Sequence, residues 1–502
     1  MTAGAAAGPV WVGVDLGTQS VRAVVLGADG RVAGRGTRPL TDTRDGARHE
    51  QDPDEWWTAT AGACRAALDG VPSGAVRGVA VDGTSGTVLI TDHDGRPVTP
   101  ALMYDDGRAA EPADLLDRVN TAGEATWAAL GYRRMQPAWA LPKLLWLLRH
   151  HDVPAGARLA HQTDVVNRRL TGGPVATDLS SALKTGADLA AERWPAGVMD
   201  ALDVPPGLLP PLVRSGTPIG EVCRAAAGET GIPAGTPVIA GATDGCAAQL
   251  ATGRLGAGAW NSVLGTTLVL KGVTPELVQD PSGVVYSHRA PDGGWLPGGA
   301  SSTGAGALSR DFPGRDLAGL DALAAAHEPS GALTYPLHAT GERFPFVAPG
   351  AHGFWLGEPA GEAERFAAIL QGVGYLERLC FDYLDLLGAP TGGPLTLTGG
   401  AARSAYWCRL RADILGRPVE VPTAPDGAEP ALGMAILGAA AGDPHPVAEV
   451  AAALRPPATT VEPRTSHIGR FDAPYLRFVE ELQRRGWLPA PVAAHARERT
   501  PR

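Results

Sequence analysis

The sequence predicts an α/β protein made of two similarly folded domains. The first observation is the length of the chain: 502 residues are more than a single domain with one hydrophobic core normally contains. The second is that strand-like and helix-like segments alternate in both halves of the chain. The third is a repeated glycine–threonine turn, at Gly17 and again at Gly265, about half the chain apart. A repeat at that distance predicts two like-folded domains.

The first half begins with strands and continues with alternating strands and helices. Asp52 and Pro53 mark a helix start, because Asp caps helices well and Pro fits the first turn. The expected elements are strands at 10–16, 21–26 and 31–36, a helix at 52–68, strands at 77–81 and 87–91, and helix and loop over 140–235.

The second half repeats this alternation after a strand at 236–241 and a small-residue helix at 246–252. It is expected to hold a hairpin from 259, a helix at 362–387, a strand at 394–398, and helices at 404–415 and 430–441. Both sheets are expected to be rich in parallel strands. The predicted domains are 10–246 and 247–488, with flexible tails at 1–9 and 489–502.

Composition excludes several classes of protein. The net charge is −10 and the basic residues are scattered, which argues against nucleic acid as the main partner. No apolar run approaches the ~18 residues of a membrane span, and the start lacks the features of a secretory signal. Five scattered cysteines without a C-x-x-C pair indicate a cytoplasmic protein without disulfides or zinc. The oligomeric state stays open, with a homodimer as one option.

The two glycine turns are candidate phosphate-binding sites. Each has apolar residues, then Leu-Gly-Thr, then apolar residues again, and such a turn can present backbone N–H groups to a polyphosphate. Asp15 ends the strand before the first turn, where a carboxylate could hold Mg²⁺ through water. The alternative is a plain hairpin with Asp in its turn.

Asp244 is the candidate catalytic base. It follows a strand and precedes a helix near the middle of the chain, and ligands of open α/β sheets bind beyond the carboxyl ends of strands. A carboxylate there could take the proton of an alcohol that attacks a phosphorus atom. The alternative, equally weighted, is a helix N-cap.

Two further segments are weaker candidates. Gly399 and Gly400 at a strand end leave room for a flat base or ribose, and Trp407 could face an adenine, although a helical Trp is more often core. The turn from Asp82 to Gly86 offers hydroxyls suited to a polyol, although a bare turn is the more frequent explanation. The Ala- and Gly-rich stretch 431–441 is explained better by close helix packing than by a ligand wall.

Four segments, taken in order, resemble the motifs of the FGGY carbohydrate kinases: Asp15–Thr18, Glu50–Trp57, Ala242–Gly245 and Thr398–Ala401. The resemblance extends from about Val10 to Leu488. It implies two ribonuclease-H-like domains of the actin/hexokinase/Hsp70 type around an ATP and sugar cleft. It also implies MgATP as the phosphate donor and a sugar or polyol as the acceptor.

The resemblance also implies roles for individual residues. Asp244 would be the general base, and Asp15 a partner of substrate and of Mg²⁺. The implied substrate-binding residues are Asp15, Thr84, Ser85 and Asp244. The implied ATP-binding residues are Gly17, Thr18, Gln19, Gly265, Thr266, Thr267, Gly399, Gly400, Ser404 and Trp407.

Within the family, the turn Asp82–Thr87 lacks the histidine of the Ser-Gly-Gln-Met-His-Gly turn that ordinary xylulokinases carry. Together with Gly341–Phe346 and other segments, it resembles a xylulokinase-like subgroup of D-ribulose kinases. The expected function is therefore ATP-dependent phosphorylation of D-ribulose. D-xylulose, another ketose or a polyol are alternative acceptors, and a non-catalytic nucleotide-binding protein is the third hypothesis.

Overall fold

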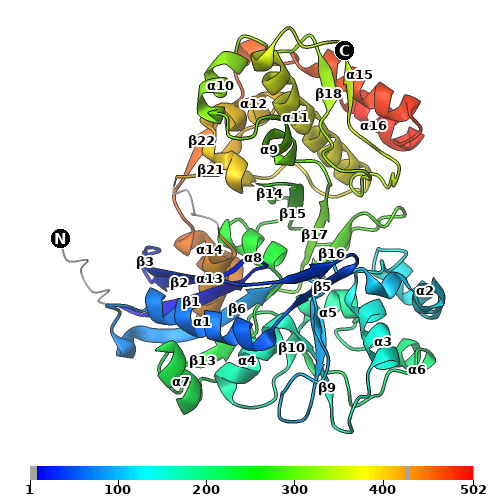
Figure 1. Cartoon of the computed structure of the whole chain (residues 1–502). Coiled ribbons are helices and arrows are strands. Elements are labelled where there is room, and N and C mark those ends of the chain that lie inside the picture. The colour runs from blue at the N-terminus through cyan, green and yellow to red at the C-terminus, as the bar shows by residue number, and fades with distance from the viewer. Residues whose placement is uncertain (1–7, 112, 424–428, 501–502) are drawn as a thin grey trace. The chain divides into compact units, whose positions relative to one another are not determined.

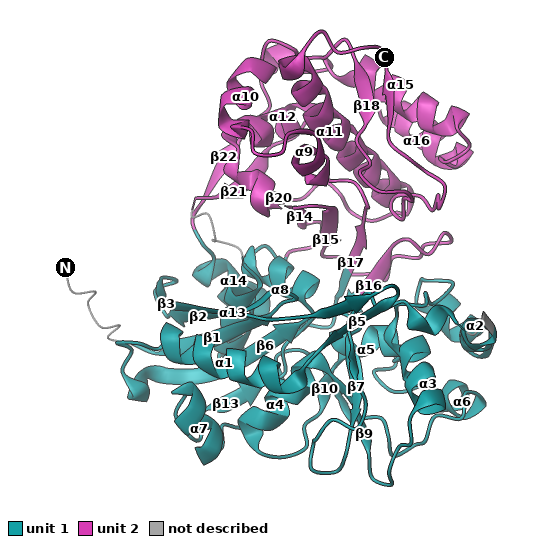
Figure 2. Ribbon diagram, in the orientation of Figure 1, with its two compact units in different colours: residues 1–255, 288–296, 428–456 teal, residues 256–287, 297–427, 457–502 magenta. Residues whose placement is uncertain are grey.

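The chain forms two units, each built around a mixed β-sheet (Figure 2). The computed structural model describes residues 8–111, 113–423 and 429–500. Unit 1 contains residues 1–255, 288–296 and 428–456, and unit 2 contains 256–287, 297–427 and 457–502. A single boundary after residue 246 was expected, but the chain returns to unit 1 twice. In the described part of the chain, no helix has both the length and the apolar character needed to cross a membrane.

The main sheet of unit 1 has the strand order β12-β13-β6-β1-β2-β3. These strands are β1 (Val10–Leu16), β2 (Ser20–Gly27), β3 (Val32–Pro39), β6 (Val76–Gly83), β12 (Pro218–Glu221) and β13 (Pro237–Ile239). The pairs β1–β6 and β6–β13 are parallel, whereas β1–β2, β2–β3 and β12–β13 are antiparallel. The expectation of a parallel-rich sheet is wrong, because three of its five pairings are antiparallel.

Helices cover both faces of this sheet (Figure 1). On one face lie α1 (Pro53–Ala67), α4 (Gln162–Thr171) and α7 (Arg224–Thr230), and on the other α8 (Asp244–Ala251) and α13 (Pro430–Ala440), with α14 (Val447–Leu454) against α13. The helix start at Asp52 is confirmed, since its carboxylate accepts from the N–H of Asp54 at 2.9 Å.

Small residues let α13 lie directly on the sheet. A Cβ on Gly13 of β1 would collide with the backbone oxygen of Ala431, and one on Gly433 would collide with that of Ala247 on α8. The Ala and Gly content of 431–441 therefore serves close packing, which was the favoured explanation.

A second, five-stranded sheet of unit 1 has the order β4-β5-β8-β7-β9. Its strands are β4 (Thr43–Asp45), β5 (Arg48–Gln51), β7 (Val88–Thr91), β8 (Ala101–Leu102) and β9 (Arg158–His161). The remaining elements of unit 1 are α2 (Ala113–Ala129), α3 (Ala140–His150), β10 (Thr177–Asp178), α5 (Leu179–Ala182), α6 (Ala196–Ala201) and β11 (Leu212–Val213). The segment 140–235 is thus mostly helix and loop, as expected, with a few short strands.

The sheet of unit 2 repeats the topology of the first. Its order is β16-β17-β15-β14-β20-β21-β22. The strands are β14 (Trp260–Leu264), β15 (Leu268–Gly272), β16 (Tyr286–Arg289), β17 (Trp295–Ala300), β20 (Leu395–Thr398), β21 (Val419–Pro422) and β22 (Ala458–Val461). From β17 to β22 the pairings run antiparallel, antiparallel, parallel, parallel, antiparallel, the same succession as from β3 to β12. The internal repeat inferred from the two turns is confirmed.

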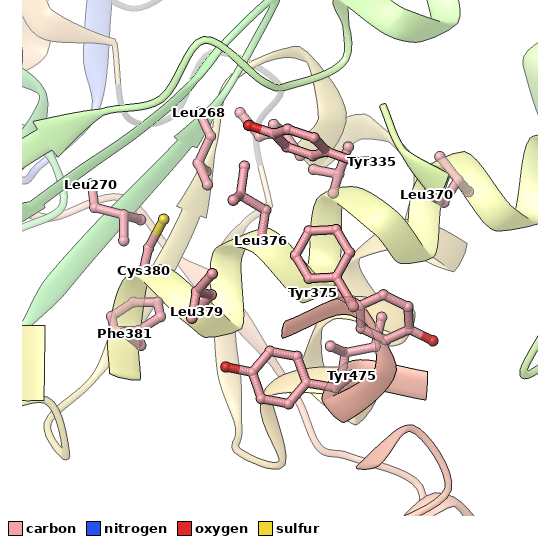
Figure 3. Close-up of a cluster of buried hydrophobic side chains, with 14 of the residues drawn as sticks. Leu268, Leu270, Tyr335, Leu370, Tyr375, Leu376, Leu379, Cys380, Phe381 and Tyr475 are labelled. Carbon is pink, nitrogen blue, oxygen red and sulfur yellow. The ribbon is translucent and has the colours of Figure 1, made fainter. Parts of the chain in front are cut away.

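The core of unit 2 forms between this sheet and the long helix α11 (Glu362–Leu386). Leu268 and Leu270 of β15 lie toward Leu376 and Cys380 of the helix (Figure 3). The rings of Trp260 on β14 and Phe381 on α11 pack edge to face, with their centroids 5.9 Å apart. The other elements of unit 2 are α9 (Gly306–Asp311), α10 (Leu317–Ala324), β18 (Leu333–Tyr335), β19 (Phe354–Leu356), α12 (Ala405–Leu415), α15 (Asp472–Arg484) and α16 (Ala490–Arg499).

The described part of the C-terminal segment, residues 489–500, does not match the expectation of a flexible tail, and most of the other predicted tail, residues 1–7, lies outside the described residues. Residues 490–499 form α16, and Val492, Ala493 and Ala496 are buried against the core of unit 2. The Pro at the helix start and the Ala-rich composition suit a short helix with one apolar face.

Candidate active site

Three carboxylates meet at the strand ends of unit 1. Asp15 near the end of β1 and Asp82 near the end of β6 are register partners in the parallel pair. Asp244 begins α8, and a bridge between Gly83 and Thr243 brings its loop beside the end of β6. We call Asp15, Asp82 and Asp244 the carboxylate cluster. Carboxyl ends of neighbouring parallel strands are where open α/β sheets bind ligands.

The cluster changes the acidity of its members. Burial raises the pKa of Asp15 from 3.8 to about 6; Arg22, whose Nη1 lies 3.7 Å from Oδ2, lowers it, and the nearby charge of Asp244 raises it. Burial, followed by the charges of Asp15 and Asp244, raises the pKa of Asp82 well above its ordinary value. Within the described residues no donor reaches either oxygen of Asp82, which is 0% exposed. The direction of this shift favours the protonated form of Asp82, beside the carboxylate of Asp15.

Asp244 differs from the other two carboxylates because it is exposed. Its Oδ1 accepts from the N–H of Gly245 at 2.7 Å. The N-cap position of α8 belongs to Thr243, and Asp244 is the first helical residue. The cap alternative for Asp244 is therefore not supported, and its carboxylate is exposed to solvent beside two buried ones.

A buried hydrogen-bond chain fixes the backbone before Asp244. The N–H of Thr243 donates to Ser180 Oγ at 2.9 Å, and that hydroxyl donates to Asp178 Oδ1 at 2.5 Å. Asp178 also caps α5 by accepting from the N–H of Ser181. Sequence reasoning missed this support, because a residue 63 positions away in the chain carries no local signal for it.

In the polar turn after β6, the two hydroxyls predicted to bind substrate have different surroundings. Thr84 is 8% exposed, and its hydroxyl is engaged by Gln162 Oε1 at 2.7 Å and by Thr87 Oγ1 at 2.5 Å. Ser85 Oγ has no hydrogen-bond partner in the described part of the chain, and its backbone oxygen accepts from Lys184 Nζ at 2.9 Å. The hydroxyl of Thr84 therefore serves the turn itself, whereas the buried Ser85 hydroxyl is left without a partner among the described residues.

Gln51, which lies 33 residues further along the chain, forms a hydrogen bond with the first glycine turn. Gln51 Nε2 donates to the backbone oxygen of Thr18 at 2.6 Å, and Gln51 Oε1 accepts from Trp56 Nε1 at 2.8 Å. The N–H of Gly17 is used within the turn, on the oxygen of Ser20. Gln51 thus joins the start of the predicted helix 52–68 to the first glycine turn.

The second turn lies in unit 2 and is open around its glycine. The N–H of Gly265 donates to the oxygen of Thr267 at 3.1 Å, and a Cβ on Gly265 would have no neighbour within 4 Å. Thr266 is exposed. Neither Gly17 nor Gly265 has a positive φ, so backbone strain is not the reason for either glycine.

The two glycines after β20 have different surroundings. Gly399 has φ +83°, and a Cβ there would lie 2.7 Å from the backbone oxygen of Leu264. The group that approaches this glycine closely is therefore the protein's own backbone. Gly400 is exposed with nothing within 4 Å of a Cβ. Ser404 caps α12 by accepting from the N–H of Trp407 at 2.9 Å, and it donates to Asp321 at 2.6 Å.

The expectation that Trp407 faces an adenine is not supported. Its side chain is 3% exposed and packs in the core of unit 2. The indole gives this helix its apolar face, which is the usual role of a helical Trp.

The unit 1 site suits a magnesium ion bound largely through water. No group of three or more His, Cys, Asp or Glu side chains among the described residues could hold a metal by itself. Carboxylate oxygens are the hard ligands that Mg²⁺ takes, and this ion usually keeps several waters and adds substrate phosphates. Asp15, with its oxygens beside Asp82, fits such a limited role.

Comparison with known proteins agrees with this geometry. Residues 10–251 match the N-terminal domain of the FGGY family of carbohydrate kinases, and residues 260–442 match its C-terminal domain. The chain belongs to the FGGY family of carbohydrate kinases. It is an ATP-dependent sugar kinase, and the two matched domains fall on the two repeated sheets.

Individual relatives cover nearly the whole chain. It is 30% identical to the xylulose kinase of Escherichia coli K12, covering 87% of this chain and 91% of that one. It is 32% identical to the xylulose kinase of Streptomyces coelicolor, covering 87% and 88%. Among solved structures, the xylulose kinase of Rhodospirillum rubrum superimposes with a TM-score of 0.82 at 26% identity, over 94% of this chain and 98% of that one.

Proposed function

We propose that the protein transfers the γ-phosphoryl group of MgATP to the terminal hydroxyl of a ketopentose. The observation that carries this proposal is the carboxylate cluster: an exposed Asp244 beside the buried pair Asp15 and Asp82. Phosphoryl transfer needs positioning and charge stabilisation more than covalent chemistry, and this arrangement offers one solvent-exposed carboxylate as a base.

Asp244 acts as the general base. Its carboxylate takes the proton of the sugar hydroxyl as the hydroxyl oxygen forms a bond to the γ-phosphorus. The bond between that phosphorus and the β,γ-bridging oxygen breaks, ADP leaves, and the proton on Asp244 passes to water. The chain Thr243–Ser180–Asp178 holds the backbone that carries the base.

The buried pair orients the acceptor side of the reaction. Asp82, whose raised pKa favours the protonated form, lies beside Asp15 and would help to hold that carboxylate in place. Asp15 would hold Mg²⁺ through water, and the ion would neutralise charge on the phosphates. The backbone and hydroxyls of Thr18 and Thr266 contact the phosphates in this proposal, with Gly400 and Ser404 nearer the adenosine.

For the acceptor, D-ribulose is our first candidate, and the case rests on the turn at Asp82–Thr87. The histidine of the ordinary xylulokinase turn is absent, and Ser85 offers an unpartnered hydroxyl. D-ribulose and D-xylulose differ in the hand of one hydroxyl, and a site that bonds a hydroxyl penalises its misplacement. D-xylulose is the second candidate, because the relatives named above are xylulose kinases.

An ADP-release assay across ketoses and polyols tests the proposal. Purified protein with MgATP should release ADP when a ketopentose is added and much less with glycerol or ribitol. Asp244→Asn serves as the control, since the same sugars should then give no increase. A wild-type protein whose ADP release is indifferent to every sugar would refute the kinase mechanism, and a preference for a polyol would refute the ketopentose acceptor.

A further inference from the structure

A buried glutamate of unit 2 organises the segment that lies against the second glycine turn. Glu342 is 3% exposed and follows Gly341 in a loop after β18. It lies far along the chain from the turn at Gly265–Thr267, so neither the repeat nor the turn itself points to it.

Backbone hydrogen bonds join the segment 301–306, which follows β17, to the second glycine turn. The N–H of Leu268 donates to Thr303 O at 2.8 Å, that of Ala305 to Gly265 O at 2.9 Å, and that of Gly306 to Thr266 O at 3.1 Å. A Cβ on Gly304 would lie 2.6 Å from Thr266 O. The shape of the turn is therefore coupled to the shape of this segment.

Glu342 in turn holds the start of the segment. Its Oε2 accepts from the hydroxyls of Ser301 at 2.9 Å, Thr303 at 3.1 Å and Tyr335 at 2.6 Å. Its Oε1 accepts from the backbone N–H groups of Ser302 at 2.7 Å and Arg343 at 2.9 Å. Within the described residues these donors are neutral, and a carboxylate that gathers so many of them fixes their positions together.

We propose that Glu342 is a positioning residue for nucleotide binding: through Ser301–Thr303 it sets the backbone of Gly265–Thr267 in the form that receives the phosphates of ATP. This inference rests on the proposed role of the second turn. Backbone donors act on a polyphosphate only if they are held in place before it arrives. Loss of Glu342 should therefore weaken ATP binding without touching any atom of the sugar site in unit 1.

The two sides of the carboxylate predict which substitutions are tolerated. Oε2 faces only hydroxyls, which can turn to accept a hydrogen bond, whereas Oε1 faces backbone N–H groups, which can only donate. Glu342→Gln can place its amide oxygen toward Ser302 and its two amide hydrogens toward two of the three hydroxyls. We expect Glu342→Gln to keep most of the network and Glu342→Ala to lose it.

Asp280 provides a matched control. It is 2% exposed, lies in unit 2, and accepts from the N–H groups of Ser282 and Val284 and from the hydroxyl of Tyr383. None of these groups belongs to 265–267 or to 301–306. Asp280→Ala should therefore lower the stability of unit 2 by removing a buried carboxylate, as Glu342→Ala does, but should leave the turn at Gly265–Thr267 unchanged.

The experiment measures the affinity of a non-hydrolysable ATP analogue by calorimetry, with KM values for ATP and sugar and melting temperatures for every variant. Glu342→Ala should weaken analogue binding by about tenfold or more, while Glu342→Gln and Asp280→Ala stay within about threefold of wild type. The sugar KM should stay within about threefold in all variants.

Equal losses of analogue affinity in Glu342→Ala and Asp280→Ala would overturn the inference. If Glu342→Ala does not fold, Thr303→Val, which removes one donor to Oε2 and keeps the shape, must weaken analogue binding more than Asp280→Ala does. A wild-type protein that binds the analogue but phosphorylates no sugar would refute the proposed acceptor and leave this inference supported by binding. A wild type that binds no analogue would contradict both.

Discussion

Asp15→Asn should leave the protein inactive but more stable than wild type at neutral pH. Asp15 has a pKa of about 6 in the folded protein against an ordinary value of 3.8, with burial as the main cause. The folded state therefore keeps a proton that the unfolded state has released, and wild-type stability falls as pH rises from about 4 through about 6. Asparagine has nearly the same size and cannot ionise, so it removes this pH-dependent cost.

The raised pKa sets the size of the effect. At about 1.4 kcal/mol per pKa unit, the cost of ionising Asp15 in the folded state reaches about 3 kcal/mol above pH 6. At about pH 4.5 only about 1 kcal/mol of it is present, so the stability of Asp15→Asn relative to wild type should rise by about 2 kcal/mol between pH 4.5 and 7.5. Asp15 is 6% exposed, so solvent screening reduces this little.

Urea unfolding of both proteins at the two pH values, without nucleotide or Mg²⁺, measures this difference. Because each protein is its own reference at the lower pH, groups that titrate alike in both cancel. A variant whose advantage over wild type does not change with pH would refute the assignment of a raised pKa to Asp15. A variant with normal turnover would refute its place in the active site.

Three further predictions concern single side chains. Asp244→Asn should lower kcat by roughly 10²- to 10⁴-fold with nearly normal ATP affinity, and kinetics retaining more than about a tenth of wild-type kcat would exclude the base role. Gly399→Ala should lower the melting temperature, because φ is +83° and Leu264 is in the way, whereas Gly400→Ala should fold normally; equal melting temperatures would contradict this difference. Gly265→Ala should fold normally, since nothing lies within 4 Å of its Cβ, yet it should raise the KM for ATP; an unchanged KM would remove phosphates from this turn.

The sequence predicted the elements around the site closely because their signals are local. β1 matches the expected strand at both ends, and α1 begins after Asp52 as its cap residues indicate. The repeated turn at Gly17 and Gly265 predicted two matching folds, because a hairpin turn can be recognised from a few consecutive residues.

What could not be predicted depends on contacts between distant segments. Asp82 was assigned to a polar turn, and its place beside Asp15 follows only from the parallel pairing of β1 with β6. Thr84 and Ser85 are neighbours in sequence with similar side chains, and it is Gln162 that separates their roles. Trp407 could have faced either side of its helix, and the packing of unit 2 put it in the core.

The account is tested most directly by a competition between two sugars. Equal concentrations of D-ribulose and D-xylulose are incubated together with MgATP and the enzyme, and the two pentulose 5-phosphates are measured during the first few per cent of conversion. Their ratio is the ratio of the two kcat/KM values. The account predicts D-ribulose 5-phosphate as the main product in wild type and neither product in Asp244→Asn. D-xylulose 5-phosphate in about tenfold excess would contradict the assigned acceptor, and formation of either product by Asp244→Asn at the wild-type rate would contradict the mechanism.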